Sequence, residues 1–169
     1  LYIFVPCTTI SASDSLVFFH ELEYHSDFEA ESFQDFNAPG QPDYLKIALT
    51  VEPGSDSAIV QMARNQLHDI ESFLLKKNIH KKNQKKQIKL IYKTVHDRLF
   101  KKYEEEILFD KIFRKGLYNC VTASVLYALI FDRFNIPYEI KMSSNHVYLY
   151  AFPRTESILV ESTNPVEGY

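Results

Sequence analysis

The stretch GLYNCVTASVLYALIFDRF, residues 116–134, decides how the rest of this chain must fold. Its first four residues, ending at Asn119, are small or turn-prone, and the run from Val121 to Phe134 is apolar around much of a helical circumference. A helix of that kind is stable only when most of its sides are buried. The pattern therefore predicts a central helix with Cys120 in its first turn, ended by Asn135-Ile136-Pro137 because proline cannot continue a helix.

The segments after this helix alternate between apolar and polar side chains. Residues 138–142, 146–152 and 157–163 each have the pattern of a strand, and the turn-forming residues 153–156 join the last two as a hairpin. The predicted fold class is therefore α+β. We expect N-terminal helices plus a central Cys-bearing helix packed on a small antiparallel sheet.

Two amphipathic helices are predicted before the central one. Apolar residues recur at helical spacing over residues 57–77, after a turn in which Ser55 or Asp56 caps the helix. A polar turn leads into a second, antiparallel helix from 84 to about 104. Residues 14–36 predict a short helix or strand followed by an acidic helix, residues 44–49 fit either a helical turn or a short strand, and residues 109–113 predict an ordered loop.

Length and composition favour one domain, because 169 residues with 46% hydrophobic side chains suffice for a single core. We expect residues 14–169 to form that domain and residues 1–13 to be either the remnant of a signal peptide or a first strand. We also expect a truncated C-terminus, with a repeat or second domain in the full-length chain. Export to the periplasm or cell envelope is favoured over the cytoplasm, and no stretch reaches the roughly 18–20 apolar residues of a membrane span.

The net charge of −3 is unevenly distributed. Residues 76–103 contain 11 Lys or Arg and one acid, Asp97, whereas residues 1–75 contain 12 acids and 2 bases. Two interpretations remain open: the lysines form a solvated helix face that pairs with the acidic N-terminal part, or they form a binding patch. No aromatic residues are interleaved as in single-strand-binding surfaces, so we do not expect a nucleic-acid partner.

A cysteine, a histidine and a glutamate that follow the charged region suggest a site with a thiol nucleophile. Cys120 precedes His146 by 26 residues, and Glu161 follows 15 residues later, which leaves room for a helix, a reversal and a hairpin. Both a helix N-terminus and a neighbouring imidazolium lower a cysteine pKa toward neutrality. The remaining histidines have no second ligand at metal spacing, so neither a metal nor another cofactor is predicted. With Cys7 as the second of only two cysteines, a disulfide framework is excluded.

The residues around these three positions resemble the transglutaminase-like (papain-like) superfamily. The motifs that carry the resemblance are Tyr118-Asn119-Cys120, Asn145-His146-Val147-Tyr148, Val160-Glu161-Ser162-Thr163 and the terminal Gly168-Tyr169. They are most similar to an uncharacterised bacterial branch that includes chains fused to tetratricopeptide repeats. The resemblance covers residues 109–169, the motif core of the predicted domain.

The resemblance implies a catalytic role for each of the three residues. Cys120 would be the nucleophile, His146 the general base and later acid, and Glu161 the group that orients the imidazole, where the superfamily more often has Asp. The Cys120 backbone N–H would bind the oxyanion. The tryptophan that some transglutaminases use as a second donor is absent. Asn119, Tyr118 and Asn145 are the alternatives for that donor, and Tyr148 is a further candidate for lining the site.

The implied function is a cysteine-dependent amide hydrolase or acyltransferase that acts on a peptide or protein amide through a thioester. Hydrolysis is favoured over cross-linking, because the sequence has neither a dedicated amine-acceptor site nor the calcium loops of animal transglutaminases. The alternative is a catalytically degenerate transglutaminase-like module that binds peptides or proteins, since a fold does not determine a function.

Overall fold

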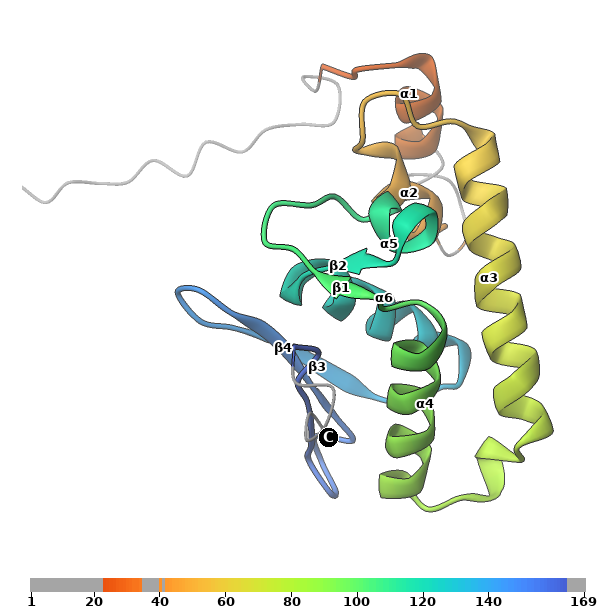
Figure 1. Ribbon diagram of the computed structural model, residues 1–169, viewed down its shortest axis with the longest axis vertical. Helices are drawn as coiled ribbons and strands as arrows, with labels where there is room; N and C mark the ends of the chain where they lie inside the picture. Colours follow the sequence, from red (N-terminus) through yellow and green to blue (C-terminus); the bar gives the residue numbers. More distant parts are fainter. Residues whose placement is uncertain (1–22, 35–39, 41, 164–169) are drawn as a thin grey trace, which may run out of the picture.

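The computed structural model describes residues 23–34, 40 and 42–163 (Figure 1). The predictions for residues 1–13, for the segment before residue 23 and for Gly168-Tyr169 lie outside these residues. Helices make up most of the described chain, and the strands lie between residues 102 and 160, so the chain is a mixed α+β protein as predicted. The helices are α1 (Asp27–Gln34), α2 (Tyr44–Thr50), α3 (Ser57–Lys76), the 3₁₀ turn η3 (Ile79–Lys81), α4 (Gln84–Arg98), α5 (Asp110–Lys115) and α6 (Cys120–Arg133).

The long helices α3 and α4 form an antiparallel pair (Figure 1). Asp56 caps α3 by accepting the N–H groups of Ala58 and Ile59 at 3.0 and 3.1 Å, which chooses between the two predicted caps. Both helices bury one apolar stripe and leave the opposite face exposed. The buried residues are Ile59, Val60, Ala63, Leu67, Ile70 and Leu74 on α3, and Ile88, Ile91, Tyr92, Thr94 and Val95 on α4.

Two segments differ from the predicted secondary structure, and a third shows which of two predicted alternatives forms. The α4 helix ends at Arg98 instead of about residue 104, because residues 102–103 form the strand β1 (Lys102–Tyr103), which pairs in parallel with β2 (Leu117–Tyr118). The predicted loop at 109–113 is largely the helix α5, ended by Gly116 in a left-handed conformation with φ of 75°. Residues 44–50, for which helix and strand remained open, are helical.

The C-terminal strands form an antiparallel sheet in the order β3-β4-β5. Its strands are β3 (Tyr138–Met142), β4 (Val147–Ala151) and β5 (Ile158–Val160). In register, Lys141 lies opposite Tyr148, and Leu149 lies opposite Val160. All three strands are shorter than or equal to their predicted spans, and Glu161 follows directly after the last one.

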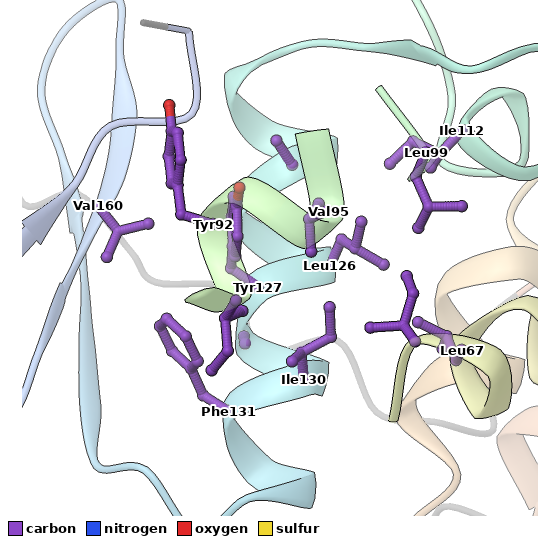
Figure 2. Close-up of a cluster of buried hydrophobic side chains, with 14 of the residues drawn as sticks. Leu67, Tyr92, Val95, Leu99, Ile112, Leu126, Tyr127, Ile130, Phe131 and Val160 are labelled. Carbon is purple, nitrogen blue, oxygen red and sulfur yellow. The ribbon is translucent and has the colours of Figure 1, made fainter. Parts of the chain in front are cut away.

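The helix α6 is the centre of the core. Figure 2 shows its side chains reaching toward Leu67 of α3 in one direction and toward Val160 of β5 in the other. Leu126, Tyr127 and Phe131 are completely buried. Because burying one such side chain contributes roughly 1.5–3 kcal/mol, this helix accounts for much of the stability. Its burial explains why the run from Val121 to Phe134 is apolar on nearly every side.

Within the described part of the chain, no helix is both long enough and apolar enough to cross a membrane.

Candidate functional site

Cys120 occupies the first position of α6, and a capping box fixes that start. The Asn119 side chain accepts the Thr122 N–H at 2.8 Å, while the Thr122 hydroxyl oxygen accepts the Asn119 N–H at 3.0 Å. The N–H groups of a first helical turn have no intrahelical acceptor, so the Cys120 N–H points out of the helix end. The thiol is partly exposed. The residue therefore combines an accessible sulfur with the positive end of the helix dipole.

The Asn119 amide also holds the loop beside the thiol. Its Nδ2 group donates to the backbone carbonyl of Glu105 at 2.8 Å and to that of Ile107 at 3.5 Å. Both amide hydrogens are thus used within the fold. Asn119, one of the predicted oxyanion donors, is positioned as a cap and a loop anchor and has no amide hydrogen left for a substrate.

A hydrogen bond joins His146 Nε2 to Glu161 Oε2. The other carboxylate oxygen accepts the Thr163 N–H at 2.9 Å and the Thr163 hydroxyl at 2.6 Å. Partial burial by itself would raise the pKa of Glu161, but the bonds from Thr163 and His146 outweigh it and hold that pKa below its ordinary value. Glu161 is therefore a carboxylate near neutral pH.

The backbone at Glu161 is fixed by the hydroxyl of Tyr92, which donates to the Glu161 carbonyl oxygen at 2.7 Å. This bond joins α4 to the segment after β5. The His146 ring is held from another side by Tyr148, whose ring centroid lies 5.8 Å away at an interplanar angle of 24°. With Nε2 bonded to the carboxylate, Nδ1 is the ring nitrogen left to exchange a proton with a thiol.

One hydrogen bond connects the helix of the thiol to the strand of the imidazole. The Ser124 hydroxyl, one turn along α6 from Cys120, donates to the Val147 carbonyl at 3.4 Å, and Val147 directly follows His146. Residues four apart share a helix face, so Cys120 and Ser124 both face this end of β4. In the described residues, His146 is hydrogen-bonded to Glu161 and no hydrogen bond joins it to Cys120.

The other predicted lining residues differ in their accessibility. The Tyr118 ring is buried and stacks on Phe100 at 4.1 Å between centroids. Asn145 is exposed at the β3–β4 reversal, 3.5 Å from the Ser143 hydroxyl. Tyr148 stands beside the imidazole. Of these candidates, Tyr148 is the one that directly contacts a member of the predicted triad.

Tyr103 is a site residue that the sequence did not reveal. Tyr103 lies opposite Tyr118 in the β1–β2 pair, and Tyr118 precedes Cys120 by two residues. The exposed fraction of Tyr103 is 41%. Desolvation raises the pKa of Tyr103, and negative charge at Cys120, Glu105 and Glu161 raises it further, so the phenol lies within electrostatic range of both Cys120 and Glu161. Local periodicity had placed Tyr103 inside a helix, and only the strand pairing brings it to the site.

Among the described residues, no three His, Cys, Asp or Glu side chains are grouped to hold a metal ion. A cavity of about 780 Å³ lies between α6 and β3, lined by Val125, Leu129 and Ile140 among others. Cys120 is not one of its lining residues, so this cavity is separate from the thiol.

The chain was compared with protein-family models, curated proteins and solved structures. No family model matches the chain, and neither the comparison with curated proteins nor the comparison with solved structures finds a match.

Proposed function

We propose that this protein is a cysteine-dependent amide hydrolase or acyltransferase with a Cys120-His146-Glu161 triad, built on a transglutaminase-like core. The observation that carries the proposal is the pair formed by His146 and Glu161, next to the strand that α6 contacts through Ser124. A carboxylate that accepts one imidazole N–H orients the ring and stabilises its protonated form. A partly exposed thiol at a helix N-terminus supplies the nucleophile.

The reaction divides into two acyl transfers. His146 Nδ1 takes the thiol proton, the sulfur of Cys120 attacks the amide carbonyl carbon, and the C–N bond breaks as the imidazolium protonates the leaving amine. In the second step His146 takes a proton from water, the oxygen attacks the thioester carbon, and the C–S bond breaks to release a carboxylic acid and the thiol. An amine in place of water would give a new amide. We propose hydrolysis as the main outcome and a peptide or protein amide as the substrate.

The oxyanion that forms in each step needs two donors. The Cys120 backbone N–H is the first, because no intrahelical acceptor competes for it. We assign the second to the Tyr103 hydroxyl, since the Asn119 amide is engaged with Glu105 and Ile107. A phenol that lies within range of a thiolate and remains protonated is suited to donate a hydrogen bond.

Alkylation kinetics test the triad without knowledge of the substrate. In a Cys7→Ser background, Cys120 of the folded chain should react with iodoacetamide at about pH 6–7 at least tenfold faster than Cys120 of the same chain in denaturant. The proposed triad predicts this difference, because a thiol paired with an imidazole at a helix N-terminus is more nucleophilic than a thiol of an unfolded chain. The variant His146→Ala should remove most of this difference. Equal rates in folded and denatured protein would contradict an activated thiol.

A second experiment addresses turnover. The folded Cys7→Ser chain should form an acetyl-Cys120 adduct with p-nitrophenyl acetate, detected by mass spectrometry, and the adduct should decay by hydrolysis. Tyr148→Phe is a matched control, because it keeps the ring that stacks on His146. An adduct that forms at the same rate in His146→Ala would exclude His146 as the base.

The absence of a Cys120–His146 hydrogen bond in the described residues supports a second candidate function, a peptide-binding module with a degenerate site. Degenerate and active members of one fold share their architecture, so they are distinguished by whether the cysteine reacts. A chain whose Cys120 has ordinary thiol reactivity, but which still binds peptides after Cys120→Ala, would support the binding module and overturn the enzyme.

A further inference from the structure

The far end of the α3–α4 pair carries a cluster of positive charge that the candidate site does not use. We name it the lysine surface, and it consists of Lys76, Lys77, Lys81, Lys82, Lys85, Lys86, Lys89 and Lys93. All but Lys82 are exposed. They come from the last turn of α3, from η3 and the turn after it, and from the outer face of α4, so they gather at the end of the pair where the two helices are joined.

The acidic N-terminal helix does not cover this surface. Figure 1 places α1 and α2 at one end of α3 and the α3–α4 connection at the other, and α1 packs against α2. One of the two interpretations of the charge asymmetry paired the lysines with the acidic N-terminal part, and the described helix α1 makes no such pairing. Among the described residues, Lys81, Lys82, Lys85, Lys86 and Lys93 form no ion pair.

The charge arrangement opposes the stability of α4. The first turn of this helix contains no acid and two lysines, Lys85 and Lys86, next to the positive end of the helix dipole. Lys89 and Lys93 continue the row at a spacing of four, where like charges repel. Lys85, Lys86 and Lys93 form no ion pair among the described residues, and a sequence that keeps such a local conflict points to a function outside the fold.

The chemistry of the surface favours a diffuse anionic partner over a nucleic acid. Lysine is a hydrated point charge without the planar fork of arginine. Arg98 lies over the Phe73 ring at 4.3 Å, and Lys77 lies over the same ring at 5.4 Å. Cations already contact this ring, so it is not free to stack on a base.

Three amide side chains on this face take part in hydrogen bonds within the fold. Asn83 caps α4 by accepting the Lys86 N–H, Gln87 donates to the Ile79 and Lys82 carbonyls, and Gln84 accepts the Thr155 hydroxyl. Reading a base edge requires amide or guanidinium groups that are free to bond it. The surface instead combines lysines with one exposed leucine, Leu75, which is 48% exposed.

We propose that the lysine surface docks this protein onto an anionic membrane, with the lysines over the acidic headgroups and Leu75 at the interface. Basic clusters bind acidic leaflets through additive contributions from each lysine, and an adjacent apolar side chain adds to the binding. The proposal is independent of the triad, because none of the residues involved belongs to the candidate site.

Vesicle co-sedimentation of the full chain tests the proposal. The protein should bind vesicles of phosphatidylcholine with phosphatidylserine and not vesicles of phosphatidylcholine alone, and binding should weaken as sodium chloride is raised. The triple variant Lys85→Gln, Lys86→Gln and Lys93→Gln should lose about a hundredfold in apparent affinity. Glutamine keeps helix propensity, so α4 should remain folded by circular dichroism.

A matched variant separates the surface from net charge. Lys101→Gln, Lys115→Gln and Lys141→Gln changes the net charge equally at exposed positions outside the lysine surface, and it should bind the acidic vesicles like the unaltered chain. Equal losses in both triple variants, no binding to acidic vesicles, or binding to a DNA duplex and not to the vesicles would each overturn the proposal.

Discussion

The partly buried ring of His96 should make the fold sensitive to acid. Its centroid lies 4.4 Å from that of Tyr92, 5.0 Å from Phe100 and 5.9 Å from Tyr118. Its Nε2 atom is buried and has no hydrogen-bond partner in the described part of the chain. Burial lowers the pKa of His96 from 6.5 to about 4, although the Asp97 carboxylate acts in the opposite direction.

The sign of the effect follows from proton linkage. The folded state keeps His96 neutral down to about pH 4, whereas the unfolded chain binds a proton near pH 6.5, so acid favours unfolding across that window and has no effect through this group above it. At 1.36 kcal/mol per pH unit the full gap corresponds to about 3 kcal/mol. Because the ring is only partly removed from solvent, we expect about 2 kcal/mol between pH 7 and pH 4.5.

Urea unfolding of the unaltered chain and of His96→Phe at these two pH values measures the contribution. The variant keeps an aromatic ring in the cluster and removes the titrating nitrogen, so its free energy of unfolding should fall by about 2 kcal/mol less on acidification. His68 lies on the exposed face of α3. The variant His68→Gln should therefore lose as much free energy of unfolding between the two pH values as the unaltered chain. An equal acid-induced loss in His96→Phe and the unaltered chain would refute the reasoning.

Three further substitutions test the structure around the thiol. Gly116→Ala should destabilise the fold by about 1–3 kcal/mol in urea, since φ is +75° and a Cβ would lie 2.9 Å from the Leu99 carbonyl oxygen. Asn119→Ala removes the cap of α6 and should lower the free energy of unfolding by about 1–2 kcal/mol, with slower alkylation of Cys120. Tyr103→Phe should slow acetyl-Cys120 formation at least tenfold while the iodoacetamide rate stays within about twofold, because only acyl transfer forms an oxyanion.

Helix positions were predictable where a local pattern was strong. The stripe on α3, the turn at Gly116 and the apolar run of α6 depend on residues within a few positions of one another, and α3 and α6 begin and end within a residue or so of the expected bounds. The end of α4 was not predictable in this way. It depends on the Gly116 carbonyl, which accepts the N–H groups of Lys101 and Lys102 from a distant part of the chain.

The candidate site was predictable only as a set of residue types in order. Cys120, His146 and Glu161 follow from the sequence as a proposal, since a helix start and two strand ends can be located locally. Tyr103 and the anchoring of the 105–107 loop by Asn119 were missed, because the first depends on pairing between β1 and β2 and the second on bonds across 12 to 14 residues.

The sequence by itself determined the helices α3 and α6, the three C-terminal strands and the position of the cysteine at the start of α6, because hydrophobic period and capping chemistry act over one or two helical turns. The helix α5 and the strands β1 and β2 were not among the predicted elements. Only the tertiary structure decided that His146 pairs with Glu161, that Tyr103 comes within range of Cys120, and that the lysine surface lies at the opposite end from the acidic helix α1. Those relations depend on how buried faces pack against one another, and side chains distant in sequence meet only once the core around α6 has formed.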